Sequence, residues 1–198
     1  MVFKYLEKLE SLAVVGATGL VGREFLSILG EQNIQIPSLK LVASSKSKGE
    51  EIEVNGKPYW VESIEDFDFG CVEACFFSVP NDVTRDFVPV ALQAGCLVVD
   101  DSSVFRLIEE TPLVIPEINS ELLKDFSHKL ISTPNCVAVP LAMVLAPLND
   151  IFGIEEAFVS TYQSVSGAGR RAFEALSNQT VQLLNGAEVE SQDYPHRF

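Results

Sequence analysis

A cysteine stands where an apolar strand pattern gives way to a helical one, and this placement suits a nucleophile. Cys136 ends the segment Thr-Pro-Asn-Cys, and a helical pattern of apolar residues follows from 137 to 148. The positive end of a helix dipole stabilises a thiolate, which is the reactive form of the side chain. This is where a nucleophilic cysteine would be placed. The alternative is a small hydrophobic residue buried in the core.

The other three cysteines are less suited to chemistry. Cys75 and Cys96 lie in or beside apolar strand patterns, so we expect both in the core. Cys71 precedes a strand pattern and has no basic neighbour in the sequence. No His lies near the Cys71 and Cys75 pair, so a zinc site is not expected. The prediction for the whole chain is therefore no metal site.

A glycine-rich turn joins the first apolar run, 11–16, to a helical pattern over 19–29. Its spacing, G-x-x-G-x-x-G, is a variant of the dinucleotide fingerprint, in which backbone N–H groups and a helix N-terminus face a pyrophosphate. The alternative is an ordinary turn that starts a helix. We predict that the cofactor contacts the following residues of this turn: Gly16, Thr18, Gly19, Leu20, Val21 and Gly22.

The loop after the second strand pattern favours NADP over NAD. The strand pattern at 39–43 is followed by Ser-Ser-Lys-Ser-Lys-Gly, with no Asp or Glu to bind the ribose hydroxyls. A lysine and several hydroxyls suit a ribose 2′-phosphate. A plain solvated loop is the alternative interpretation.

Short apolar strands that alternate with helices predict an α/β fold with a doubly wound, parallel sheet. Further expected strands cover 72–79, 97–100, 113–115, 131–133 and 155–162, and Asn55-Gly56 predicts a hairpin within 51–61. Further helices are expected at 83–94 and 171–184. We predict a Rossmann-type domain over 1–133 and the start of a mixed α/β catalytic and dimerisation domain over 134–198. The second part is short for such a domain, so we expect the front part of a longer protein.

Composition excludes several classes of function. The 198 residues carry 14 Lys+Arg and 28 Asp+Glu, a net charge of −14, which disfavours nucleic acid and anionic membranes as partners. The longest apolar run, 137–148, is too short to span a bilayer. The first residues show no signal-peptide pattern, and four cysteines make no disulfide framework. We expect a cytoplasmic protein.

Several segments together resemble one family. They are GATGLVG (16–22), SSKSKG (44–49), DSSVFR (101–106), VIPEIN (114–119), TPNC (133–136) and TYQSVSGAG (161–169). In order and spacing, the chain resembles the N-terminal part of the aspartate-semialdehyde dehydrogenase family. The resemblance implies reductive dephosphorylation of aspartyl phosphate with NADPH, release of inorganic phosphate, a homodimer, and a place in lysine, diaminopimelate, threonine and methionine biosynthesis.

The resemblance also assigns roles to single residues. Cys136 matches the nucleophile that forms a thioester, and Gln163 matches the glutamine that orients the acyl group. Arg106 matches the arginine that binds the substrate phosphate, and Asn135 is expected to contact substrate. The remaining matches are on the cofactor: Lys46 and Ser47 beside the 2′-phosphate, and Ser166 and Gly167 near the nicotinamide.

The chain departs from the family at some positions. Asp101 stands where the family usually has Asn, and Val-Pro-Asn at 79–81 replaces a glycine-rich turn. His128 and His196 do not match the catalytic His, which is expected beyond residue 198 together with a substrate-binding Arg. The 198 residues alone are therefore expected to bind NADP with almost no turnover. The alternatives are a non-catalytic paralogue and N-acetylglutamyl-phosphate reductase, whose cysteine typically follows Pro-Gly.

Overall fold

The computed structural model describes residues 9–124, 129–189 and 197 of the chain. It divides into two compact units, Met1–Glu155 and Glu156–Phe198, and each is described by itself. His128 and His196 lie outside the described residues. The boundary expected at residue 133 stays a prediction.

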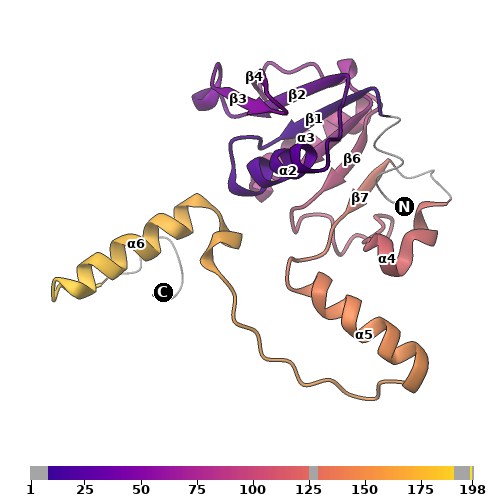
Figure 1. Ribbon diagram of the computed structural model, residues 1–198, viewed down its shortest axis with the longest axis vertical. Coiled ribbons are helices and arrows are strands. Elements are labelled where there is room, and N and C mark those ends of the chain that lie inside the picture. The colour runs from indigo at the N-terminus through magenta and orange to yellow at the C-terminus, as the bar shows by residue number, and fades with distance from the viewer. Residues whose placement is uncertain (1–8, 125–128, 190–196, 198) are drawn as a thin grey trace. The chain divides into compact units, whose positions relative to one another are not determined.

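The first unit is built on a seven-stranded sheet with the order β3-β4-β2-β1-β5-β6-β7 (Figure 1). All neighbouring strands are parallel except β3 and β4. The strand order runs outward from β1 through β2 to β4, and outward on the other side from β5 to β7, so it reverses between β1 and β5. This confirms the doubly wound fold. The strands are β1 (Ser11–Val15), β2 (Ser38–Ala43), β3 (Glu51–Val54), β4 (Lys57–Ser63), β5 (Ala74–Phe77), β6 (Leu97–Asp100) and β7 (Leu130–Ser132).

The four predicted helices all form, and the described residues also include one further short helix and several 3-10 turns. No helix within the described ranges is long and apolar enough to cross a membrane. The helices are α2 (Leu20–Glu31), α3 (Asn81–Gln93), α4 (Pro116–Asn119), α5 (Ala138–Phe152) and α6 (Arg170–Leu184). The 3-10 turns are η1 (Ser45–Ser47), η2 (Phe69–Cys71), η3 (Ser120–Leu123) and η4 (Val165–Ala168).

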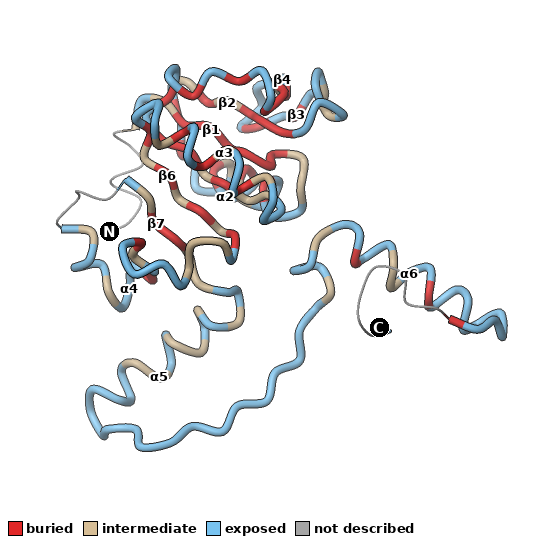
Figure 2. Tube along the Cα trace, turned by 180° about the vertical axis from the view of Figure 1, so that it is seen from behind, coloured by how far each residue is buried: buried red, intermediate tan, exposed pale blue. Residues whose placement is uncertain are grey.

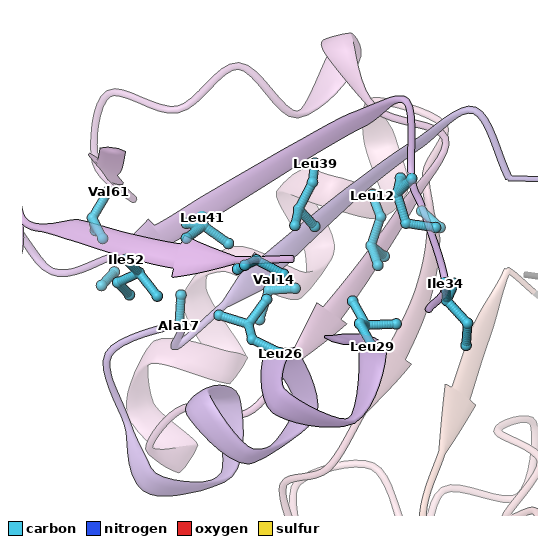
Figure 3. Close-up of a cluster of buried hydrophobic side chains, with 14 residues drawn as sticks. Leu12, Val14, Ala17, Leu26, Leu29, Ile34, Leu39, Leu41, Ile52 and Val61 are labelled. Carbon is cyan, nitrogen blue, oxygen red and sulfur yellow. The ribbon is translucent and has the colours of Figure 1, made fainter. Parts of the chain in front are cut away.

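The sheet is buried on both faces, because a helix packs on each. On one face, Leu12 and Val14 of β1 belong to a cluster with Leu26 and Leu29 of α2 (Figure 3). On the other face, Ala13 and Val15 belong to a cluster that includes residues of α3. Each fully buried Val or Leu side chain stabilises the fold by about 1.5–3 kcal/mol. Burial on both faces explains why β1 reads as a continuous apolar run rather than an alternating one.

The second cluster also contains two of the cysteines. Cys75 and Cys96 are both buried there, as the apolar strand patterns predicted. Burial raises the pKa of the Cys75 thiol far above its ordinary value, so this sulfur stays protonated. Their thiols are therefore core groups rather than nucleophiles.

The predicted hairpin forms between β3 and β4. Asn55 and Gly56 have φ of +53° and +72°, and Val54 pairs with Lys57. A two-residue turn with both φ angles positive matches the right-handed twist of the strands. The hairpin places an antiparallel strand at the edge of the sheet.

Two strand predictions are wrong. The described residues from 153 to 164 form no strand, although residues 155–162 alternate. No described strand pairs with them, and Phe158 is 94% exposed. Figure 2 shows the segment between α5 and α6 as largely exposed. The strand expected at 113–115 is reduced to a single bridge between Leu113 and Ser132. Pro116 ends it, because proline has no N–H for a sheet and is well suited to start α4.

Candidate active site

The glycine turn lies at the carboxyl end of β1, where the order of the strands reverses. Gly16 has φ of +94°, and a Cβ there would lie 2.1 Å from the carbonyl oxygen of Ser78, after β5. A Cβ on Gly22 would lie 2.2 Å from the carbonyl oxygen of Gly16. Only glycine fits either position, since both approaches are to backbone. These glycines bring the turn against the neighbouring strand and the helix against the turn.

Helix α2 begins without a capping side chain and without an acidic residue in its first turn. No side chain of the described residues therefore accepts from its first-turn N–H groups, which carry the positive end of the helix dipole. The turn is held in place because the N–H groups of Gly16 and Ala17 donate to the carbonyl oxygen of Val42, at 2.8 and 3.2 Å. Such a helix start is an anion site at a dinucleotide pyrophosphate position. The cradle fits a dinucleotide.

The loop after β2 lies beside this turn. The hydroxyls of Thr18 and Ser47 are 3.4 Å apart, so the structure brings two of the predicted cofactor residues together. Lys46 is exposed and makes no ion pair with any residue that the structure describes. Lys48 instead binds the carboxylate of Asp66 at 2.8 Å, and this hydrogen bond raises the pKa of Lys48. Lys46 is thus the lysine of this loop that is open to a ligand.

Cys136 is exposed, so it does not belong to the core. Asn135, the residue before it, holds the turn that leads into helix α5, which begins at Ala138. The side-chain oxygen of Asn135 accepts from the N–H of Val137 at 3.0 Å, and its backbone oxygen accepts from the N–H of Ala138 at 2.9 Å. The thiol of Cys136 lies 4.0 Å from the same side-chain oxygen. Asn135 therefore fixes the backbone around the sulfur, and its Nδ2 makes no hydrogen bond within the described part of the chain.

Arg106 ties the loop after β6 to the segment that leads to Cys136. Its Nε donates to the carbonyl oxygen of Thr133 at 2.9 Å, and its Nη2 donates to that of Asp101 at 2.7 Å. The Asp101 carboxylate accepts from the Thr133 hydroxyl at 2.9 Å and lies 3.9 Å from Nη2 of Arg106. No hydrogen bond to the described residues uses Nη1. One edge of the guanidinium is thus a clamp, and its outer edge is available to an anion.

Asp100 lies beneath this loop and is fully buried. Its carboxylate accepts from the Ser102 hydroxyl at 2.7 Å and from the Ser102 N–H at 3.1 Å. Burial raises the pKa of Asp100 despite these two hydrogen bonds. Asp100 therefore holds the loop after β6 in place, although burial disfavours its ionised form.

The remaining predicted residues belong to the second unit. Gln163 is exposed, and its amide donates to the hydroxyl of Thr161 at 3.2 Å. Ser166 lies in η4, where its hydroxyl is 2.9 Å from that of Ser164, and Gly167 has open space at its Cβ position. Cys136 belongs to the first unit. Among the residues described, no group of three or more metal-ligand side chains gathers.

Sequence reasoning missed Arg23, Glu50 and the hydroxyl of Thr133. Arg23 forms an ion pair with Glu50, across 27 residues of chain. The available signal was position alone: Arg23 stands one helical turn after Gly19, and Glu50 directly follows the SSKSKG loop. Thr133 directly follows the last strand, β7, and its hydroxyl donates to the Asp101 carboxylate.

A doubly wound sheet with a glycine turn at the reversal of strand order defines a dinucleotide-binding protein. Residues 11–126 match the family model described as semialdehyde dehydrogenase, NAD binding domain, and residues 145–197 match the semialdehyde dehydrogenase dimerisation domain. The chain belongs to the semialdehyde dehydrogenase family.

Known relatives agree with this assignment. An aspartate-semialdehyde dehydrogenase of Rickettsia bellii is 45% identical over 95% of this chain and 56% of the relative. Aspartate semialdehyde dehydrogenase II of Vibrio cholerae, solved in complex with ASA, matches with a TM-score of 0.88 at 37% identity, over 96% of this chain and 57% of its own. The enzyme of Candida albicans, solved with NADP, shares the fold at 24% identity and a TM-score of 0.59, over 74% of this chain and 48% of its own. The chain thus spans somewhat more than half the length of these first two relatives.

Proposed function

We propose that these residues form the cofactor-binding part and carry the nucleophile of an NADP-dependent aspartate-semialdehyde dehydrogenase. The reaction is reductive dephosphorylation of L-aspartyl 4-phosphate to L-aspartate 4-semialdehyde. The observation that carries the proposal is the exposed sulfur of Cys136. It lies three residues after Thr133, whose carbonyl oxygen accepts a hydrogen bond from Arg106. A thiol and an anion-binding guanidinium tied to one short segment suit an acyl phosphate.

The cofactor proposal rests on two features of the first unit. The glycine turn and the open start of α2 would bind the pyrophosphate, through Gly16, Thr18, Gly19, Leu20, Val21 and Gly22. Lys46 and Ser47 would bind the 2′-phosphate, and Ser166 and Gly167 would border the nicotinamide. The related Candida albicans enzyme was solved with NADP. When bound, NADPH supplies the hydride.

In the proposed mechanism, the thiolate of Cys136 attacks the acyl carbon of the substrate. The bond from that carbon to the phosphate oxygen breaks, inorganic phosphate leaves, and a thioester remains on the sulfur. The outer edge of Arg106 holds the phosphate as it leaves. After the thioester carbon has accepted a hydride, its carbon–sulfur bond breaks, which releases the aldehyde and returns the thiolate. Gln163 orients the acyl group, and Asn135 offers its amide N–H₂ to substrate.

The proposal extends to the organisation of the whole protein. We place the cofactor domain at 1–133 and the start of the catalytic and dimerisation domain at 134–198, with a homodimer as the assembly. The pathway would supply lysine, diaminopimelate, threonine and methionine in the cytoplasm. The four cysteines are all free thiols, which suits a reducing compartment.

Alkylation kinetics test the nucleophile. The folded chain is treated with iodoacetamide at neutral pH, and peptide mass spectrometry follows each cysteine. Cys71 serves as the matched control, because it is also exposed but does not precede a long helix. We expect Cys136 to react about tenfold faster than Cys71, with Cys75 and Cys96 protected. An unreactive analogue of aspartyl phosphate should slow only Cys136.

Two outcomes contradict parts of the proposal. Equal rates at Cys136 and Cys71 would show that the sulfur is not activated, and the assignment of the nucleophile would fail. An inert Cys136 in a chain that binds NADPH tightly would favour a non-catalytic, nucleotide-binding member of the family.

A further inference from the structure

Three cationic side chains lie around the loop that follows β2, and they differ in whether a carboxylate pairs with them. Lys48 is paired with Asp66, and Arg23 is paired with Glu50. Lys46 has no ion-pair partner among the described residues. Arg23 is the one of the three that comes from helix α2, so it reaches this loop from the side of the glycine turn.

The guanidinium of Arg23 lies next to the groups proposed to bind the ribose phosphate. Its Nε is 3.4 Å from the carbonyl oxygen of Thr18, whose hydroxyl lies 3.4 Å from that of Ser47. Glu50 is held at the same loop, because its N–H donates to the carbonyl oxygen of Ser47 at 3.0 Å. Arg23, Glu50 and Ser47 therefore border one small region of the surface.

A bound phosphate can replace Glu50 as the partner of Arg23. The side chains of Arg23 and Glu50 are 45% and 38% exposed, and an exposed pair between two single charges contributes little. A phosphate carries more charge and matches the planar fork of arginine with two parallel hydrogen bonds. The Nη1 group of Arg23 makes no hydrogen bond to the described residues, so it is available for this purpose. A nucleotide without the 2′-phosphate offers no such group.

We propose that Arg23 recognises the 2′-phosphate of the cofactor together with Lys46, and that Glu50 competes for Arg23 and thereby limits the preference for NADPH over NADH. This inference rests on the proposed cofactor function and names a specificity device within it. Glu50 neutralises Arg23 in the free protein, and the phosphate must displace it from Arg23. Removing its charge while keeping its shape should therefore strengthen NADPH binding alone.

Equilibrium titrations of the chain with NADPH and NADH test the proposal. In Glu50→Gln we expect NADPH to bind about fivefold tighter, and in Arg23→Gln about tenfold weaker, with NADH changed less than about twofold in both. The double variant should bind NADPH like Arg23→Gln, since Glu50 acts through Arg23. Lys40→Gln and Glu62→Gln are matched controls, because this pair is similarly exposed at 39% and 46% but joins β2 to β4. Neither control should change either affinity.

The outcomes separate this inference from the proposed function. If the unaltered chain binds neither nucleotide, or prefers NADH, the cofactor proposal fails and this inference fails with it. If the chain prefers NADPH and Lys46→Gln reduces that preference, while Arg23→Gln and Glu50→Gln leave it unchanged, only this inference is wrong. Equal weakening of NADPH and NADH in Arg23→Gln would assign Arg23 to the pyrophosphate or to the fold. Unfolding midpoints of all variants identify any loss of structure, and Glu50→Gln, which retains Arg23, tests the inference independently.

Discussion

Arg106 and Thr133 are joined by a hydrogen bond of 2.9 Å from the guanidinium Nε to the backbone carbonyl oxygen, across 27 residues of chain. This bond fixes the end of β7 just before the segment that carries Cys136. The same side chain bonds the carbonyl of Asp101, so it ties the loop after β6 to the segment after β7. A residue expected from the family resemblance to bind phosphate is thus also a clamp on the nucleophile segment.

Because Arg106 bonds two backbone carbonyl oxygens, replacing it with another cationic residue should destabilise the fold. Arg106→Lys should lower the free energy of unfolding by about 1–3 kcal/mol, because an ammonium lacks the fork that reaches both carbonyls. Chemical denaturation measures this change. Arg85→Lys, an exposed position on α3, is the matched control and should stay within about 0.5 kcal/mol. If both substitutions cost the same, the two carbonyl bonds contribute nothing to stability.

The glycine turn predicts that a single methyl group abolishes nucleotide binding. Gly16→Ala would place its Cβ 2.1 Å from the Ser78 oxygen at a φ of +94°, so the turn must move or the chain unfolds. We expect a loss of about 3 kcal/mol or more and no measurable NADPH binding. Gly49→Ala separates the cost of a positive φ from the cost of a steric clash, because Gly49 has φ of +83° but no atom within 4 Å of its Cβ position. It should cost only about 1 kcal/mol. A Gly16→Ala chain that binds NADPH normally would contradict the cradle.

Local sequence patterns predicted the parts of the fold that depend on local physics. The buried run at β1, the positive φ angles of Asn55 and Gly56, and the glycine turn each follow from neighbouring residues and a single steric rule. The expected strand at 155–162 failed because strand formation needs a partner, and alternation alone provides none. The contacts of Arg106 and Arg23 depend on which loops the sheet brings together. Such contacts join residues that are 27 positions apart, and no local pattern contains them.

The loop after β2 predicts a charge-dependent preference for one cofactor. Lys46→Gln should weaken NADPH binding about tenfold and leave NADH binding within about twofold, because only the 2′-phosphate needs the lysine charge. Raising the salt concentration should reduce NADPH binding less in this variant than in the unaltered chain. Titrations at two salt concentrations measure both effects. If NADH binding falls equally, Lys46 supports the pyrophosphate or the loop instead.

Asp100 predicts a specific dependence of stability on pH. Burial raises its pKa in the folded chain above the value in the unfolded chain, so the folded state binds this proton more tightly. The contribution of Asp100 to stability is therefore greatest below the unfolded pKa, near 4, and is lost as pH rises through the higher folded pKa. Asn has the shape of the protonated acid without its charge. We therefore expect Asp100→Asn to become more stable, relative to the unaltered chain, as pH rises from about 3 to 7.

Denaturant unfolding of both chains at several pH values measures this difference, and exposed Asp86 provides the control. Asp86→Asn is the matched substitution at a carboxylate that is not buried. The Arg106 charge and the two Ser102 hydrogen bonds oppose the effect of burial on Asp100, whereas the Asp101 charge adds to it. A relative stability of Asp100→Asn that falls with pH would show that Ser102 and Arg106 outweigh burial. The ionised carboxylate would then be the stabilising form that holds the loop after β6.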